Sequence, residues 1–139
     1  MLKISLIKNV ASTKQIYMKD FYKKLHNGEI KIDDKTQLTD NEWLAFAVYY
    51  EFSRFVDWQN MAYHLERTIE GEEGGCSRII CFYANYFYDK AHKQNDGTNK
   101  KKKFTLKSSK TRELIRQYAC EYLDFDIELD YEELNEKTE

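Results

Sequence analysis

An unbroken run of eight apolar or aromatic side chains, from Trp43 to Tyr50, constrains this chain more than any other feature. A helix that is apolar on all sides is stable only when other elements bury it. Thr39 offers an N-cap just before the run, and Glu42 completes the spacing of a capping box. We therefore predict a central helix over residues 41–55.

Three aromatic side chains of this helix, Trp43, Phe46 and Tyr50, are expected to be deeply buried. The residues that follow predict a second, amphipathic helix over 57–69 that packs across the first. Its apolar positions recur at i, i+3, i+4, i+7 and i+11. They are Trp58, Met61, Ala62, Leu65 and Ile69.

No membrane span is expected, because the longest apolar run is far shorter than the roughly 20 residues that a bilayer requires. Residues 1–20 carry four lysines and no long apolar core, so no signal peptide is expected either. The chain is therefore predicted to be cytoplasmic, and Cys76, Cys81 and Cys120 are predicted to be buried free thiols.

Alternating apolar and polar residues predict a small sheet beside the helices. The clearest pattern is Phe125–Tyr131, in which apolar residues alternate strictly with acids. Leu2–Leu6, Glu29–Asp33 and Phe104–Lys107 alternate over shorter lengths. We expect the last strand to pair with 104–107 or 2–6. Three lysines would then face its acids: Lys3, Lys103 and Lys107 opposite Asp126, Glu128 or Asp130.

Further helices are predicted over 13–27, 76–93 and 109–123, from their apolar stripes and flanking capping residues. A chain of 139 residues suits one domain with its own core. The predicted fold class is α+β: one predominantly helical domain, 1–139, with about five helices and a small sheet of short strands. A mobile loop is expected at about 94–103, and a frayed tail at about 133–139.

The helix predicted over 76–93 has more aromatic residues than its core stripe needs. Phe82 and Tyr86 lie off that stripe and are expected at the surface or against a partner. Together with the predicted acidic strand face they form a candidate protein-binding surface. Its residues are Phe82, Tyr86, Tyr88, Asp126, Glu128 and Asp130.

Positive charge is concentrated in residues 90–116, where ten Lys or Arg stand against two acids, a balance of +8. Residues 117–139 have the opposite balance of −8. The basic segment is a candidate nucleic-acid surface, or a solvated loop that offsets the acidic strand. Its candidate residues are Lys100, Lys101, Lys102, Lys103, Lys107, Lys110, Arg112 and Arg116.

Catalytic chemistry has little support in the sequence. Asp124, Asp126 and Glu128 would project from one face of a strand, an arrangement that can hold two divalent ions. A charge-guarded edge strand explains the same pattern more simply. No histidine has a partner at catalytic spacing, and the cysteines do not have zinc-ligand spacing. We expect no metal, no cofactor and no enzymatic activity.

The N-terminal residues carry one resemblance to a known family. The segment from Lys3 to Val10, followed by Ser12, Thr13 and Lys14 and a helix that stops at Gly28, resembles the opening of virulence-associated E-type proteins. These are primase- or helicase-linked replication proteins of Bacteroidetes mobile elements. The resemblance covers about residues 1–28. It implies a phage or mobile-element context and transfers no catalytic residue.

Three function classes follow from these patterns. A protein-binding module, for example an inhibitor of a host system, ranks first, because acidic faces repel phosphate and the net charge is −2. A nucleic-acid-binding accessory protein that uses Lys100–Arg116 ranks second. A metal-dependent enzyme of nucleic-acid metabolism ranks third. The expected partner is another protein or a second copy of the chain.

Overall fold

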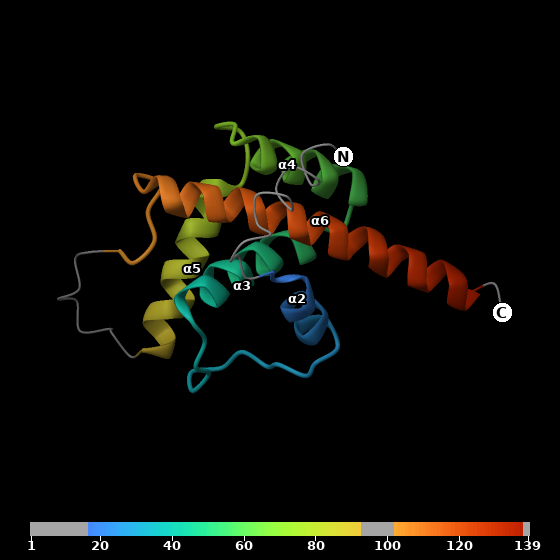
Figure 1. Cartoon of the computed structure of the whole chain (residues 1–139), viewed down its shortest axis with the longest axis horizontal. Coiled ribbons are helices and arrows are strands. Elements are labelled where there is room, and N and C mark those ends of the chain that lie inside the picture. The colour runs from blue at the N-terminus through green and yellow to red at the C-terminus, as the bar shows by residue number, and fades with distance from the viewer. Residues whose placement is uncertain (1–16, 93–101, 138–139) are drawn as a thin grey trace.

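The computed structural model describes residues 17–92 and 102–137, with side chains up to Glu133. Its helices are α2 (Lys19–His26), α3 (Asp40–Ser53), α4 (Trp58–Glu70), α5 (Ser77–Ala91) and α6 (Ser109–Lys137). Helix α6 runs the length of the molecule, with α4 on one side and α3 and α2 on the other, and α5 lies across one end (Figure 1).

Some predictions fall partly or wholly outside the described residues. These are the Leu2–Leu6 strand, residues 94–101 of the predicted loop, and most of the stretch that carries the resemblance. Within the predicted frayed tail, helix α6 extends to Lys137, and residues 138 and 139 are not described.

The predicted central helix is confirmed as α3. Its capping box is complete: Glu42 N–H donates to the Thr39 hydroxyl at 3.2 Å, and Thr39 N–H donates to the Glu42 carboxylate at 2.9 Å. Trp43 is fully buried and Phe46 nearly so, as predicted. Tyr50 is only half-buried, because it lies at the edge of the core against Tyr83 of α5.

Helix α4 ends in a tight turn that leads directly into α5. Gly71 ends the helix with a φ of +77°, a conformation that favours glycine. The buried Thr68 hydroxyl accepts a hydrogen bond from Cys76 N–H at 2.7 Å. A Cβ on Gly75 would lie 2.8 Å from the Thr68 backbone nitrogen, so a side chain there would displace the turn. Gly75 therefore allows the backbone of the turn to pack directly against the last turn of α4.

The predicted α+β fold class is wrong for the part of the chain that is described, which is helical and contains no strand. Residues 29–33 and 104–107 are irregular. Residues 125–131, predicted as the clearest strand, lie inside α6. From residue 110 to 134 the sequence has no glycine or proline, so nothing ends the helix that begins at Ser109.

The apolar residues of 125–131 show how a helix can carry an alternating pattern. Phe125 and Leu129 are one turn apart and face the core, where Phe125 is buried and Leu129 half-buried. Ile127 and Tyr131 form a second pair, also one turn apart, that is 42% and 66% exposed. Every second residue is apolar because two i, i+4 pairs are interleaved on different faces.

The acids of α6 pair with lysines other than those expected. Lys19 of α2 contacts Asp124 at 3.0 Å and also pairs with Glu128. Lys23 contacts Glu128 at 3.1 Å. Lys103, which was expected to face this segment, instead pairs with an acid at the start of α3. The acids of α6 thus position α2, and no cross-strand pairing exists among the described residues.

The stretch 104–107, also predicted as a strand, is anchored by one side chain of α5. Asn85 accepts a hydrogen bond from the backbone N–H of Phe104 at 2.8 Å and donates one to its carbonyl at 2.9 Å. Both residues are buried. The amide of Asn85 therefore satisfies the two backbone groups that a neighbouring strand would otherwise have paired.

Candidate functional site

Helix α5 has a buried face and an exposed face of different chemistry. Ile80 and Ala84 are fully buried on the inner side. On the outer side, four residues recur at i, i+4, i+8 and i+12 and form one row along the helix. This outer row consists of Arg78, Phe82, Tyr86 and Lys90.

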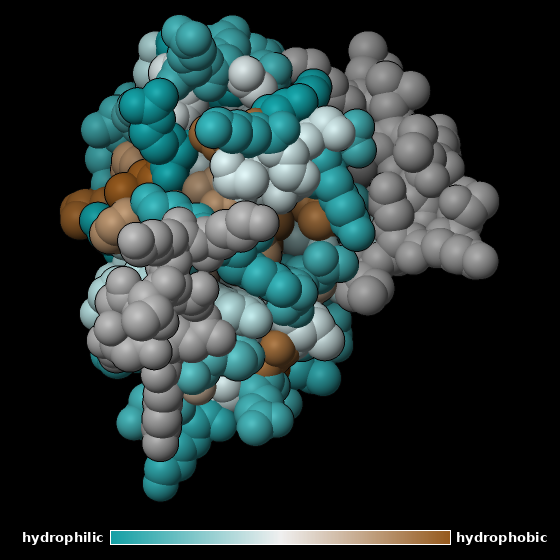
Figure 2. Space-filling view, turned by 90° about the vertical axis from the view of Figure 1, so that its left-hand side faces the viewer, coloured by the Kyte–Doolittle hydropathy of each residue, from teal (hydrophilic) through white to brown (hydrophobic). Residues whose placement is uncertain are grey.

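The two aromatic residues of the outer row are exposed, as the sequence predicted. Phe82 is 55% exposed and Tyr86 50%. Their rings are nearly parallel, with an interplanar angle of 19° and 6.4 Å between centroids. Figure 2, which faces the α5 side of the molecule, shows apolar surface in small patches separated by hydrophilic side chains. The aromatic residues are therefore part of a mixed surface, without a large apolar face around them.

Cations border this aromatic surface. Lys90 Nζ lies 5.9 Å from the Tyr86 ring centroid. Arg54 of α3 lies 5.3 Å from the Tyr50 ring and 5.5 Å from that of Tyr83, and it donates a hydrogen bond to the Tyr83 hydroxyl. This hydrogen bond raises the pKa of Arg54, so the charge is permanent. The outer row is thus an aromatic surface with a positive border.

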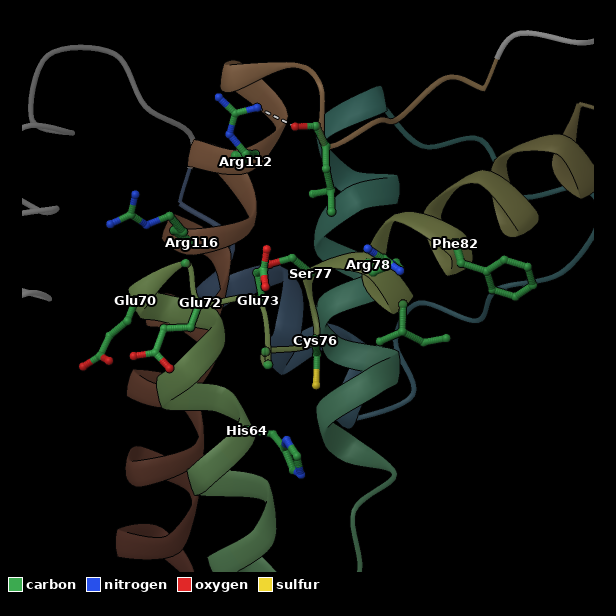
Figure 3. Close-up of a pocket in the computed structure, with 15 residues that line it drawn as sticks. His64, Glu70, Glu72, Glu73, Cys76, Ser77, Arg78, Phe82, Arg112 and Arg116 are labelled. Carbon is green, nitrogen blue, oxygen red and sulfur yellow. Dashed lines mark hydrogen bonds between the residues drawn. The ribbon is translucent and has the colours of Figure 1, made fainter.

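An open groove of about 1040 Å³ adjoins the N-terminal end of the outer row. The α4–α5 turn and the first turns of α5 and α6 form it. Charged side chains of both signs line it, three arginines and three glutamates (Figure 3). They are Arg78, Arg112, Arg116, Glu70, Glu72 and Glu73.

The arginines of the groove do not converge on one point. Figure 3 shows Arg112 and Arg116 on the side of the groove opposite Phe82. Glu73 lies between these two arginines and Phe82. Arg116 Nε donates to the Ile69 carbonyl at 3.1 Å, and Arg112 donates to the carbonyl of Leu106. Such a spread arrangement does not enclose a small anion, but it can contact an extended ligand at several points.

Arg78 belongs to both the outer row and the groove. It is exposed and has no hydrogen bond or ion pair within residues 17–92 and 102–133. A partner therefore meets an unengaged guanidinium one helical turn before Phe82. Arg78 was not among the site residues predicted from the sequence, although its position four residues before Phe82 in a predicted helix was the available signal.

Several predicted site residues lie elsewhere. Tyr88 points to the inner side of α5, where its ring stacks on His92 at 4.0 Å and contacts Phe104 at 6.1 Å. Asp126 and Glu128 lie on different faces of α6: Asp126 accepts a hydrogen bond from Trp58 Nε1, and Glu128 pairs with α2. Asp130 is exposed one turn after Asp126. The acidic strand face does not exist.

The predicted basic segment is divided in the structure. Lys100 and Lys101 lie outside the described residues. Lys103 pairs with Asp40 at 2.9 Å and lies 5.4 Å from the Tyr88 ring centroid. Arg112 and Arg116 line the groove, whereas the remaining members are exposed and do not line it. These are Lys102, Lys107 and Lys110. Two of the predicted basic residues therefore join the aromatic residue Phe82 at one site.

The cysteines are free and buried, as predicted. Burial raises the pKa of Cys76 to about 12 and that of Cys81 to about 11, so both are protonated thiols at neutral pH. Within the described ranges no group of three or more His, Cys, Asp or Glu is arranged to hold a metal ion. Of the carboxylates considered above for two divalent ions, Asp124 and Glu128 share Lys19 one turn apart on α6. Asp126 lies on another face and accepts from Trp58 instead.

No described helix is both long enough and apolar enough to cross a membrane. Comparison with known proteins found no matching protein family, no similar characterised protein and no similar solved structure. A function is therefore inferred from the geometry and charges of the outer row and the groove.

Proposed function

We propose that the chain is a protein-binding module whose contact surface is the outer row of α5 together with the adjoining groove. The observation that supports this most strongly is the exposure of Phe82 and Tyr86, one turn apart on a packed helix. Aromatic side chains dominate binding energy at interfaces, because they bring a large contact area with few rotatable bonds.

The helix that presents these rings is held rigidly. Ile80 and Ala84 are fully buried, and Asn85 is bonded to the backbone on the same inner side. Tyr83, with the hydroxyl that accepts from Arg54, joins α5 to α3. Little conformational freedom of the backbone is then lost on binding, which favours affinity.

The charges of the surface favour a polypeptide over a nucleic acid. The glutamates Glu72 and Glu73 line the groove beside the arginines, and they would repel a phosphate backbone. A protein segment with charges of both signs can satisfy such a surface. Nucleic acid is the second candidate, because bases can stack on exposed rings such as Phe82 and Tyr86 when arginine lies beside them.

The outer row also indicates the chemistry of its partner. Its cations, Arg78 and Lys90, stand at the two ends of the aromatic pair, and Arg54 adds a third positive charge. An amphipathic helix with apolar anchors at i and i+4 and flanking acids is complementary to this pattern. The phage or mobile-element setting, and inhibition of a host system, stay predictions.

The test uses nuclease-treated protein and a synthetic amphipathic peptide with two Leu at i and i+4 and flanking Glu, labelled for fluorescence anisotropy. We expect saturable binding, and at least about tenfold weaker binding by Tyr86→Asp. The matched control is Tyr131→Asp on α6, where the tyrosine is 66% exposed but remote from the outer row. A peptide with Lys in place of Glu should bind more weakly than the acidic one.

Two results would contradict the proposal. Equal binding by wild type and Tyr86→Asp would remove the outer row from the contact. Binding of DNA or RNA at about 50 mM salt, with a steep salt dependence and no binding of the peptide, would favour the nucleic-acid candidate instead. Light scattering of the protein alone addresses self-association: a dimer that Tyr86→Asp dissociates would identify a second copy as the partner.

A further inference from the structure

A second cleft, of about 440 Å³, lies between the end of α3, the start of α4 and the middle of α6. Its chemistry differs from that of the groove. Six aromatic side chains and the imidazole of His26 line it, and no lysine or arginine among the described residues does. The aromatic residues are Tyr49, Phe52, Phe55, Trp58, Tyr122 and Phe125.

The inner side of this cleft is a continuous set of ring contacts. The Tyr122 ring lies 5.7 Å from that of Phe52, 5.7 Å from that of Phe125 and 6.2 Å from that of Tyr49. Phe52, Tyr122 and Phe125 are buried, so their positions are fixed by the core. The cleft therefore has a rigid aromatic floor.

The outer side of the cleft is formed by the indole ring of Trp58, which is hydrogen-bonded to the carboxylate of Asp126. Trp58 is 52% exposed, and its Nε1 donates a hydrogen bond to Asp126 Oδ2 at 2.9 Å. This bond fixes the orientation of the ring at the mouth of the cleft. Asp126 itself lines the cleft, which is thus an aromatic enclosure with one carboxylate.

Within residues 17–92 and 102–133 the Asp126 carboxylate forms no ion pair with a lysine or arginine. Burial raises the pKa of Asp126, and the negative charges of Asp130 and Glu133 raise it further, while only the hydrogen bond from Trp58 opposes them. The nearby Lys19 and Lys23 are engaged with other acids of α6. The electrostatic field at this cleft therefore favours a positive ligand.

We infer that this cleft binds a small quaternary ammonium ion of about the size of choline. The faces of Trp and Tyr attract such a cation through the negative charge of their π systems, and its methyl groups suit the apolar lining. A quaternary ammonium has no N–H group, so it can be bound by the faces of the rings and by the charge of Asp126 without donating a hydrogen bond. Calcium and magnesium ions do not fit, because they require several oxygen ligands and the cleft offers one carboxylate.

This inference is independent of the proposed function. The cleft shares no residue with the outer row or the groove. Its ligand is a small molecule, and it would bind whether or not α5 contacts a partner.

The test is a titration of the intact chain with choline. Isothermal calorimetry and tryptophan fluorescence measure the binding. The neutral control is 3,3-dimethyl-1-butanol, which has the same shape without the charge. We expect saturable binding of choline with a dissociation constant in the range of about 0.1–10 mM, and no saturable binding of the neutral isostere. The Trp58→Phe variant separates the fluorescence of Trp58 from that of buried Trp43.

Two variants locate the site. Asp126→Asn preserves the shape of the side chain and Trp58→Leu preserves an apolar side chain, and each should weaken choline binding by about tenfold. The control is Tyr63→Leu, since Tyr63 is an exposed aromatic residue of α4 that does not line the cleft. Circular dichroism and the midpoint of thermal unfolding verify that each variant is folded.

Three outcomes would overturn the inference. Equal binding of choline and its isostere would show a purely apolar cleft. Absence of saturable choline binding at concentrations up to about 100 mM would show that the cleft is not a cation site. Binding of a peptide with trimethyllysine, without binding of free choline or tetramethylammonium, would show that the ligand is a modified protein and not a free ion.

Discussion

Helices α3 and α5 are both rich in aromatic residues, but they use them in opposite ways. In α3 the residues from Trp43 to Val48 are all buried, and a complete capping box fixes where the helix begins. In α5 only one face is buried, and Phe82 and Tyr86 are exposed. The side-chain hydroxyl and carboxylate that cap α3 have no equivalent in α5, whose N-cap residue, Cys76, makes no capping hydrogen bond.

The difference arises from position in the bundle. Helix α3 packs against both α5 and α6, so it has neighbours on opposite sides. Helix α5 lies at one end of the molecule, where nothing described covers its outer face (Figure 1). The number of aromatic residues in a helix therefore does not distinguish core from contact surface. The direction in which the aromatic side chains point, toward or away from the neighbouring helices, distinguishes core from contact surface.

The largest expected effect is in α3. Phe46→Ala should lower the free energy of unfolding by about 3–5 kcal/mol, because it removes a buried ring that contacts Phe87 at 5.0 Å. Denaturant unfolding measures this, with Phe82→Ala as the matched control, expected to cost less than about 1 kcal/mol. A loss below about 1 kcal/mol for Phe46→Ala would show that α3 is not the core helix.

The inner face of α5 should behave like α3. Asn85→Ala leaves the buried N–H and carbonyl of Phe104 without partners, so we expect a loss of about 1–3 kcal/mol in the same measurement. Asn60→Ala, at an exposed position of α4, should change stability by less than about 0.5 kcal/mol. Equal effects of the two substitutions would mean that the inner face of α5 is no more tightly held than the surface.

The pH dependence of stability tests the burial of the two thiols, Cys76 and Cys81, at α5. Burial raises the pKa values of Cys76 and Cys81 in the folded chain to about 12 and about 11, above the value of 9.0 for an exposed thiol. The unfolded chain therefore loses these protons first, and the contribution to stability, fully present below about pH 9, should be lost as pH rises toward 11–12. Urea unfolding at successive pH values measures this. Cys81→Ala should flatten the decline, and an unchanged slope would contradict the assignment.

The smallest expected effect is on the outer face of α5. Tyr86→Ala should change the free energy of unfolding by less than about 0.5 kcal/mol, since half of the side chain is already in contact with water. A loss of more than about 2 kcal/mol would show that Tyr86 supports the fold, and would end the contrast between the two helices.

The sequence predicted the positions of α3, α4 and α5 along the chain well, because their signals are local. The prediction that α4 packs across α3 was wrong, since α4 packs mainly on α6, and that choice of neighbour is tertiary. Eight successive apolar residues, a capping box and glycines at the helix ends specify where each helix lies. The exposure of Phe82 and Tyr86 also followed from the sequence, as the residues left outside the apolar stripe.

Helix α6 could not be predicted in full, because its second half contains two interleaved patterns. The pairs Phe125 with Leu129 and Ile127 with Tyr131 each have helical spacing, but together they imitate a strand. The absence of glycine and proline from 110 to 134 favours one continuous helix. The positions of Lys19 and Lys23 beside the acids agree with it, but that information is tertiary.

The residues of the two sites also come together only in the tertiary structure. The groove combines Arg78 of α5 with Arg112 and Arg116 of α6, more than thirty residues away along the chain. In the aromatic cleft, Trp58 and Asp126 meet although they are 68 positions apart in the sequence. No spacing rule brings such residues together before the helices are packed.

The pair of hydrogen bonds between Asn85 and Phe104 has a consequence for the engineering of this chain. It joins the end of α5 to the approach to α6, independently of the residues between His92 and Lys102. Residues inserted between His92 and Lys102 leave both hydrogen bonds in place, and each doubling of a connection's length costs only about 0.6 kcal/mol. We therefore expect the chain to accept an inserted tag, a fused domain or the new termini of a circular permutant between these two residues.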